Sequence, residues 1–139
     1  MTWARRVGVI ASVAGAVALL PSVAFAHPLG NATVNRADVI IASTDHISIT
    51  HILDLAEIPT VQAMPRLDSD SNETVSASEM TAYADSTCRA DADSSELRVG
   101  GQRATLSVTG SSGELLAGQA GLQTLRISCD WRTPIDLTS

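Results

Sequence analysis

The chain has 139 residues, of which 45% are hydrophobic and only 3% are aromatic. This length allows one domain with a modest core, and the scarcity of rings excludes a base-stacking platform for single-stranded nucleic acid. Nine basic residues, all Arg, against 15 acidic residues give a formal net charge of −6. That charge argues against a nucleic-acid partner. An acidic surface favours either cations as partners or simple solubility.

The beginning of the chain is typical of an export signal. Arg5 and Arg6 form a charged start, and residues 7–20 follow as an apolar run without charge. This run is shorter than the roughly 20 residues that a membrane-spanning helix needs. Cleavage after export is therefore expected rather than anchoring.

The expected cleavage site follows Ala24-Phe25-Ala26, which supplies small residues at the two positions that a signal peptidase reads. We predict a signal peptide over residues 1–26 and an exported domain over residues 27–139. The domain is expected in the periplasm or at the cell surface, or tethered to the cytoplasmic membrane in a longer form.

Alternation of apolar and polar residues predicts strands over residues 33–41 and 46–55. A short helix is expected over residues 56–64, interrupted by Pro59 and closed by Pro65.

A second, longer helix is predicted from Ser76 to about Asp93. Ser76 and Glu79 have the spacing of a capping box, in which each side chain satisfies a backbone N–H of the first turn.

The remaining chain reads as strands and turns. Gly100-Gly101 is a strong turn signal between β runs at 97–99 and 102–109, residues 110–121 are expected as a Gly/Ser-rich loop, and residues 123–131 as the last strand. The predicted fold is α+β: an antiparallel sheet of four or five strands, with one long helix and a short helical turn inserted between strands two and three.

The two cysteines point to the same core. Cys88 lies on the apolar face of the long helix, and Cys129 lies on the apolar face of the last strand. An exported protein meets an oxidising compartment, so a disulfide between them is expected. The alternative is two buried free thiols, and a metal site on the two thiolates is disfavoured because no His is near either in sequence.

An acidic segment over residues 68–79 matches the twelve-residue calcium loop of the EF-hand. Oxygen ligands are expected at loop positions 1, 3, 5, 7, 9 and 12, with a carboxylate at the last. The six predicted ligands are Asp68, Asp70, Asn72, Thr74, Ser76 and Glu79.

Two features depart from that pattern. Glu73 stands where a glycine normally makes the sharp left-handed turn, at a cost of roughly 1–2 kcal/mol. Pro65 also weakens the expected entering helix. The alternative is a solvated acidic connector in which Ser76 and Glu79 only cap a helix. If the loop binds Ca²⁺, its role is to order the helix entry, with a Kd of about 10⁻⁴–10⁻³ M.

The chain has three histidines, His27, His46 and His51. His46 and His51 face opposite sides of one strand and cannot hold one metal together, and His51 is expected as a hydrogen-bonded core residue. His27 would be the first residue after cleavage, where its amine and imidazole could chelate a transition metal; the alternative is a frayed terminus. No catalytic constellation is apparent, so the chain is expected not to be an enzyme.

Four blocks occur in a distinctive order: His27-Pro-Leu-Gly-Asn-Ala-Thr-Val-Asn35, Ile52-Leu-Asp-Leu-Ala-Glu-Ile-Pro-Thr60, the acidic loop, and Leu97-Arg-Val-Gly-Gly101. Together they make most of residues 27–131 similar to the extracytoplasmic N-terminal region of bacterial nickel/cobalt transporter-like membrane proteins of the high-affinity nickel permease type. In the family that this chain resembles, glycine usually occupies the position of Glu73.

The resemblance implies an extracytoplasmic domain that precedes a multi-helix permease, with Ni²⁺ or Co²⁺ as the transported ion. The transmembrane half, which holds that family's His/Asp helix motif, has no counterpart in these 139 residues. The chain is thus expected either as a fragment of a longer reading frame or as a stand-alone relative. No transport residue of the family can be placed on it.

From the sequence we expect a non-catalytic extracytoplasmic domain linked to divalent metal (nickel/cobalt) transport, the N-terminal part of a permease-like protein. The permease membrane domain would act in cis or in trans. The alternative is a stand-alone secreted interaction module stabilised by calcium.

Overall fold

The computed structural model describes residues 29–135. The predicted signal peptide, its cleavage site and His27 lie outside the described residues.

The described chain contains six strands, two α-helices and two short 3-10 turns. In chain order these are η1 (Leu29–Ala32), β1 (Val34–Ala42), β2 (His46–Leu55), α2 (Glu57–Leu67), α3 (Ala77–Ser94), β3 (Leu97–Val99), β4 (Gln102–Ala104), β5 (Ser107–Ala117), η2 (Gln119–Gly121) and β6 (Gln123–Pro134).

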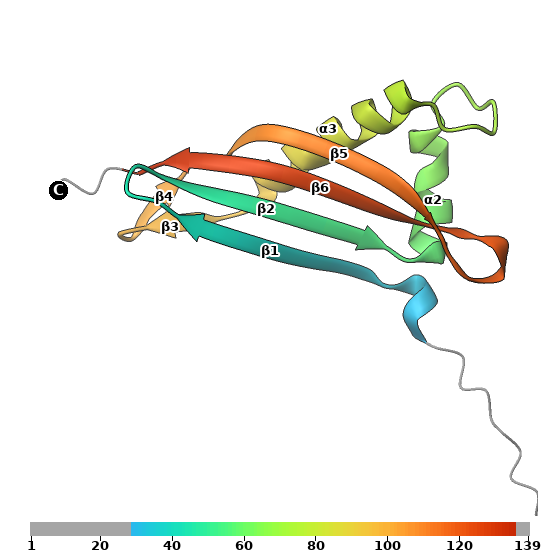
Figure 1. The fold of residues 1–139 in the computed structure, drawn as a ribbon, viewed down its shortest axis with the longest axis horizontal. Coiled ribbons are helices and arrows are strands. Elements are labelled where there is room, and N and C mark those ends of the chain that lie inside the picture. The colour runs from blue at the N-terminus through green and yellow to red at the C-terminus, as the bar shows by residue number, and fades with distance from the viewer. Residues whose placement is uncertain (1–28, 136–139) are drawn as a thin grey trace, which may run out of the picture.

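The four long strands form one antiparallel sheet in the order β1-β2-β6-β5, and β3 pairs with β4 as a separate small hairpin. Both helices lie between β2 and β3 in the chain and cover one face of the sheet (Figure 1). The predicted α+β class, strand number and placement of the helical part are confirmed.

The core lies between the helices and this covered face. Burial alternates along β2 and β6, because successive side chains of a strand point to opposite faces. The buried apolar residues are Ile47, Ile49, Leu53, Leu55, Ala63, Leu67, Ala84, Cys88, Ala92, Leu125, Ile127, Cys129 and Trp131.

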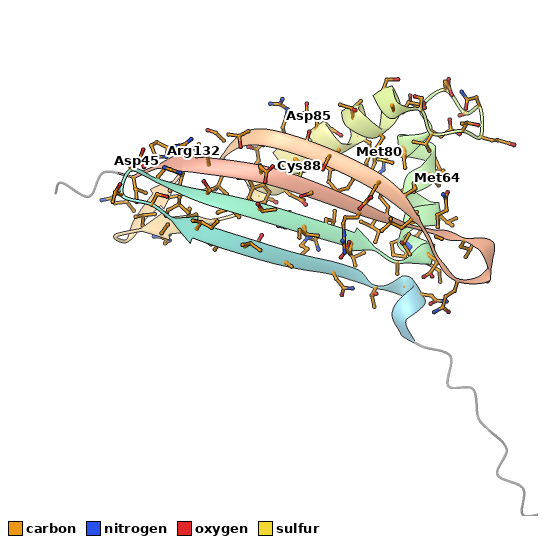
Figure 2. All side chains as sticks on the ribbon, viewed as in Figure 1. Asp45, Met64, Met80, Asp85, Cys88 and Arg132 are labelled. Atoms are coloured by element: carbon orange, nitrogen blue, oxygen red, sulfur yellow. A yellow bond between two sulfur atoms is a disulfide. The ribbon has the colours of Figure 1, made fainter. Side chains whose placement is uncertain are left out.

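The predicted disulfide is confirmed. Cys88 of α3 and Cys129 of β6 are joined, with Cα atoms 5.4 Å apart and no exposure of either residue. Cys88 is one of the residues labelled in Figure 2. The bridge ties the long helix to a central strand, and it fits a protein that works in an oxidising compartment.

The prediction that Pro65 ends the first helix is wrong. The helix α2 continues to Leu67, with Pro65 in its last turn. A proline there removes one backbone hydrogen bond, and the complete burial of Leu67 in the same turn helps to offset that loss. Pro59 causes no interruption, because it lies in the first turn, where backbone N–H groups have no helical partner.

The predicted loop over residues 110–121 is also wrong, because most of it belongs to β5. The glycine and serine content of the segment favoured a loop, but the close packing around Gly113 accounts for a glycine within a strand. A Cβ added there would lie 2.5 Å from Sδ of Met80 and 2.8 Å from Cδ1 of Ile127. Glycine therefore lets α3 approach the sheet closely, and composition alone does not reveal that.

The hairpin at Gly100-Gly101 is confirmed, with both glycines at positive φ. Its second strand is shorter than predicted: β4 ends at Ala104, and the chain re-enters the main sheet at Ser107 as β5. The run 102–109 is therefore divided between two sheets.

Candidate functional site

The acidic segment connects the two helices directly. Because α2 ends at Leu67 and α3 begins at Ala77, residues 68–79 lie between two helices, and together they form the helix–loop–helix arrangement that the calcium-loop interpretation requires. The entering helix α2 reaches the loop, with Pro65 in its last turn.

Asp68 organises the turn from its first position. The residue is largely buried, at 9% exposure. Oδ1 accepts a hydrogen bond from the backbone N of Asn72 (3.1 Å), and Oδ2 accepts one from the backbone N of Glu73 (2.9 Å). One carboxylate thus folds the loop back on itself.

The turn contains the left-handed backbone that the calcium loop needs at its sixth position. Glu73 has φ of 66°, and Ser71 has φ of 57°. A non-glycine residue in this region costs roughly 1–2 kcal/mol. The hydrogen bond from the Glu73 backbone N to Asp68 helps to offset that cost, so the missing glycine does not prevent the turn.

Glu79 projects back into the loop from the first turn of α3. Its Oε1 accepts hydrogen bonds from the N and Oγ of Ser69 (2.8 and 3.0 Å) and from the N of Asp70 (3.3 Å). Its Oε2 accepts from the N and Oγ of Ser76 (2.9 and 2.8 Å), which completes the predicted capping box. These donors, the Ser76 backbone N–H first, lower the pKa of Glu79 from 4.5 to about 2.

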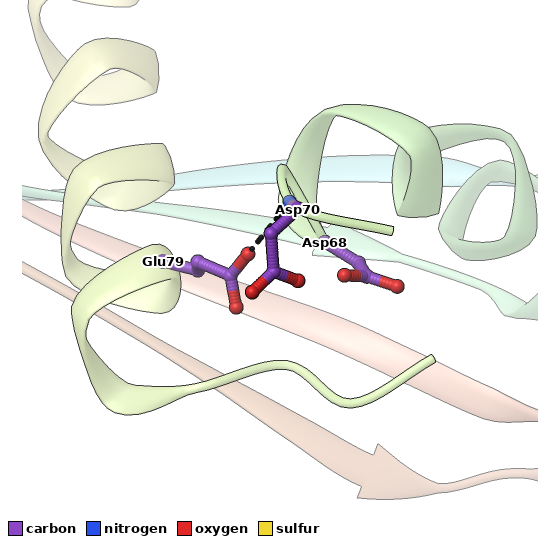
Figure 3. A group of neighbouring side chains, drawn as sticks. All are labelled: Asp68, Asp70 and Glu79. Carbon is purple, nitrogen blue, oxygen red and sulfur yellow. Dashed lines mark hydrogen bonds between the residues drawn. The ribbon is translucent and has the colours of Figure 1, made fainter. Parts of the chain in front are cut away.

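One carboxylate oxygen from each of Asp68, Asp70 and Glu79 lies within 4.8 Å of the other two. Figure 3 shows the three as neighbours, Glu79 from α3 and both aspartates from the loop. Within residues 29–135, none of the three forms an ion pair with an arginine. Three hard oxygen donors at one turn fit a cation such as Ca²⁺.

The other three predicted ligands lie in the same loop but serve its hydrogen bonds. Asn72 accepts from the backbone N of Thr74 through Oδ1 (2.8 Å) and donates to Asp70 through Nδ2 (2.8 Å). The hydroxyl of Ser76 is bonded to Glu79. A cation at the triad therefore competes with Ser69 and Asp70 for Oε1 of Glu79, which favours weak binding.

His51 occupies the core, as expected. It is 4% exposed and stacks on Trp131 at 4.6 Å between ring centroids. Its Nδ1 lies 2.6 Å from Oδ1 of Asp38, and its Nε2 lies 3.4 Å from Oδ2 of Asp91. His46, on the opposite face, is hydrogen-bonded to Asp45 (2.7 Å).

Sequence reasoning missed the two aspartates beside His51. Asp38 is its direct cross-strand partner in the β1–β2 register, and Asp91 comes from the last turns of α3. Only the register of the two strands could have indicated Asp38. No pattern in the sequence near Asp91 indicates that it lies beside His51.

No helix in the part of the chain described here is both long and apolar enough to cross a membrane. Comparison of the whole chain with models of known protein families, with curated proteins and with solved structures found no match. The site must therefore be interpreted from its own chemistry.

Proposed function

We propose that this chain is a non-catalytic extracytoplasmic domain that binds a hard divalent cation at residues 68–79 and accompanies divalent metal transport. The observation that carries the cation-binding part is the convergence of Asp68, Asp70 and Glu79 around a left-handed turn at Glu73. Ca²⁺ suits this site, because carboxylate and carbonyl oxygens are its preferred ligands.

The role of the bound ion would be structural. The triad joins the end of α2 to the start of α3, and α3 carries the disulfide to the sheet. Ca²⁺ would offset two of the three negative charges of the converging carboxylates and hold the entry of the long helix in place.

The link to nickel or cobalt comes from the resemblance of residues 27–131 to the N-terminal region of permease-like proteins. In that role Ni²⁺ or Co²⁺ is the ion that a membrane domain transports, and the acidic surface of this domain raises the local concentration of cations. A permease that takes up Ni²⁺ normally without this domain would contradict this part of the proposal.

Calorimetry on the exported full chain tests the cation site. We expect the wild type to bind Ca²⁺ with a Kd of about 10⁻⁴–10⁻³ M, and Asp70→Asn to weaken binding by about tenfold or more. Asp93→Asn is the matched control, because Asp93 is exposed on α3 and the substitution removes the same charge. Equal heats from wild type and Asp70→Asn would refute the site.

The alternative of a stand-alone calcium-stabilised interaction module is favoured by one observation, the exposure of every residue of β1 at the edge of the sheet. The genomic reading frame beyond residue 139 separates the two. Several apolar spans of about 20 residues would support the permease proposal, and a stop codon would support the module.

A further inference from the structure

The strand β1 is an open edge of the main sheet. Among residues 29–135 it pairs with β2 on one side only, and all nine of its residues are exposed. The helices do not cover it; α3 lies over the β5–β6 side (Figure 1). A long edge strand of this kind presents unpaired backbone groups to any strand that can match them.

This edge is apolar on both faces. Val34 and Ile40 lie on the helix-side face and are 43% and 57% exposed. Val39 and Ile41 lie on the opposite face and are 55% and 60% exposed. Edge strands of monomeric proteins are usually protected by charges, prolines or covering elements, whereas the charged residues of β1 are only Arg36 and Asp38.

The hydrogen bonds at the two ends of β1 show which backbone groups are directed outward. The carbonyl of Thr33 accepts from the N of Ala56 (3.0 Å), and the N of Ser43 donates to the carbonyl of His46 (2.8 Å). Bonding alternates along an antiparallel strand. Odd-numbered residues therefore bond to β2, and the even-numbered residues from Val34 to Ala42 direct their N–H and C=O groups to the open edge.

A second copy of β1 can use these outward groups, and the charges select one register. A two-fold axis at Ala37 places Arg36 opposite Asp38 of the second copy, twice by symmetry, and Val34 opposite Ile40. An axis at residue 36 or 38 would set like charges directly opposite, which is destabilising. An axis at Val39 would set Asp38 opposite Ile40 and leave Arg36 without a charged partner.

The two charged side chains are available for this contact. Arg36 has no ion-pair partner within residues 29–135. The side chain of Asp38 is 49% exposed, although its Oδ1 is bonded to His51. Cross-strand pairs of opposite charge stabilise antiparallel strands.

We propose that two copies of this chain associate through antiparallel pairing of β1 with β1, centred on Ala37, to form one continuous sheet. Even-numbered residues of both copies exchange backbone hydrogen bonds, and both helix layers lie on the same side of the joined sheet. The exposed valine and isoleucine residues of β1 are then partly covered by those of the second copy.

Engineered cysteines test both the dimer and its register. In the proposed dimer, Ala37 faces Ala37 of the second copy as a non-hydrogen-bonded pair, with Cα atoms about 4.5 Å apart, which permits a disulfide. The matched control is Asn35→Cys on the same face. In the proposed register, residue 35 lies about 13 Å along the strands from residue 35 of the second copy, which is too far for a disulfide.

Under mild oxidation of the full-length exported protein, we expect Ala37→Cys to form covalent dimers and Asn35→Cys to remain monomeric on non-reducing gels. Equal crosslinking of both variants, or of neither, would overturn the proposed register. Intact masses confirm that the Cys88–Cys129 bridge is retained in each variant.

A charge exchange tests the selection of register independently. In Arg36→Asp, residues 36 and 38 are both acidic, so negative charges face each other across the axis. In Asp38→Arg both residues are basic, so positive charges face each other. Each variant alone should therefore sediment as a monomer. An equimolar mixture should restore the dimer, because each Asp then faces an Arg. Circular dichroism checks that both variants are folded, since Asp38→Arg also removes the His51 contact.

Analytical ultracentrifugation of the wild type completes the test. We expect a monomer–dimer equilibrium whose dissociation constant rises with NaCl concentration, because salt screens the paired charges. A wild type that stays monomeric at high micromolar concentrations, or a mixture of the two variants that stays monomeric, would refute the dimer. A dimer unaffected by either charge reversal would refute the register.

Discussion

Glu79 shows how one side chain serves two structures at once. It caps α3 through Ser76 and closes the acidic loop through Ser69 and Asp70. Both tasks need the ionised carboxylate, because all five of its donors are N–H or O–H groups. The capping box was visible in the sequence, but the contact with Ser69 depends on how the loop folds back.

The pKa of Glu79, about 2 in the folded protein against 4.5 ordinarily, predicts a pH effect. Because the folded-state pKa is depressed, the stabilisation is complete above about pH 4.5 and is lost as the pH falls toward 2. Amide hydrogen exchange of the first turn of α3 should accelerate over that window.

The variant Glu79→Gln should accelerate the same exchange at neutral pH and flatten its change between pH 4.5 and 2. Glu114→Gln, an exposed residue of β5, is the control and should behave as the wild type. An unchanged pH profile in Glu79→Gln would show that the capping carboxylate does not govern this region.

At the scale of elements, the contact between α3 and β5 depends on residues with small or flexible side chains. Met80 of the helix lies over Gly113 of the strand, and Ile127 of β6 lies beside them. Interiors are packed closely enough that one added side chain must displace a neighbour.

We therefore expect Gly113→Val to destabilise the fold by about 1–3 kcal/mol through overpacking, although valine favours strands. Urea denaturation followed by circular dichroism measures the change. Ser112→Val, one residue earlier and exposed, is the matched control and should be neutral or stabilising. If the two variants were equally stable, the close approach of α3 would not constrain β5.

At the scale of the molecule, one covalent link joins the helix layer to the sheet. The disulfide closes a separation of 41 residues between Cys88 and Cys129. It restricts the unfolded chain, and both of its ends lie in the core.

Replacing both cysteines with alanine should lower the free energy of unfolding by about 4 kcal/mol, as expected for a loop of this length. Urea denaturation of the wild type and the double variant measures the difference, and the wild type with dithiothreitol should match the variant. A difference below about 1 kcal/mol would show that the helix layer is held by packing alone.

The sequence by itself determined the α+β class, the order of helices and strands, the capping box, the Gly-Gly hairpin and the cysteine pair. These features follow from local rules: period-two burial in strands, turn residues with positive φ, and hydrogen bonds within one helical turn. The acidic spacing over residues 68–79 also indicated which carboxylates converge.

Only the tertiary structure determined the conformation of segments whose local composition favours a different structure. It made residues 107–117 a strand, because they pair with β6 along nearly its whole length, with Gly113 beneath Met80. It extended α2 through Pro65 to Leu67, which is buried in the core. It also placed Asp38 and Asp91 on either side of His51 and left β1 at an open edge. Each depends on contacts between segments distant in sequence, whose energies outweigh the small preferences of single residues.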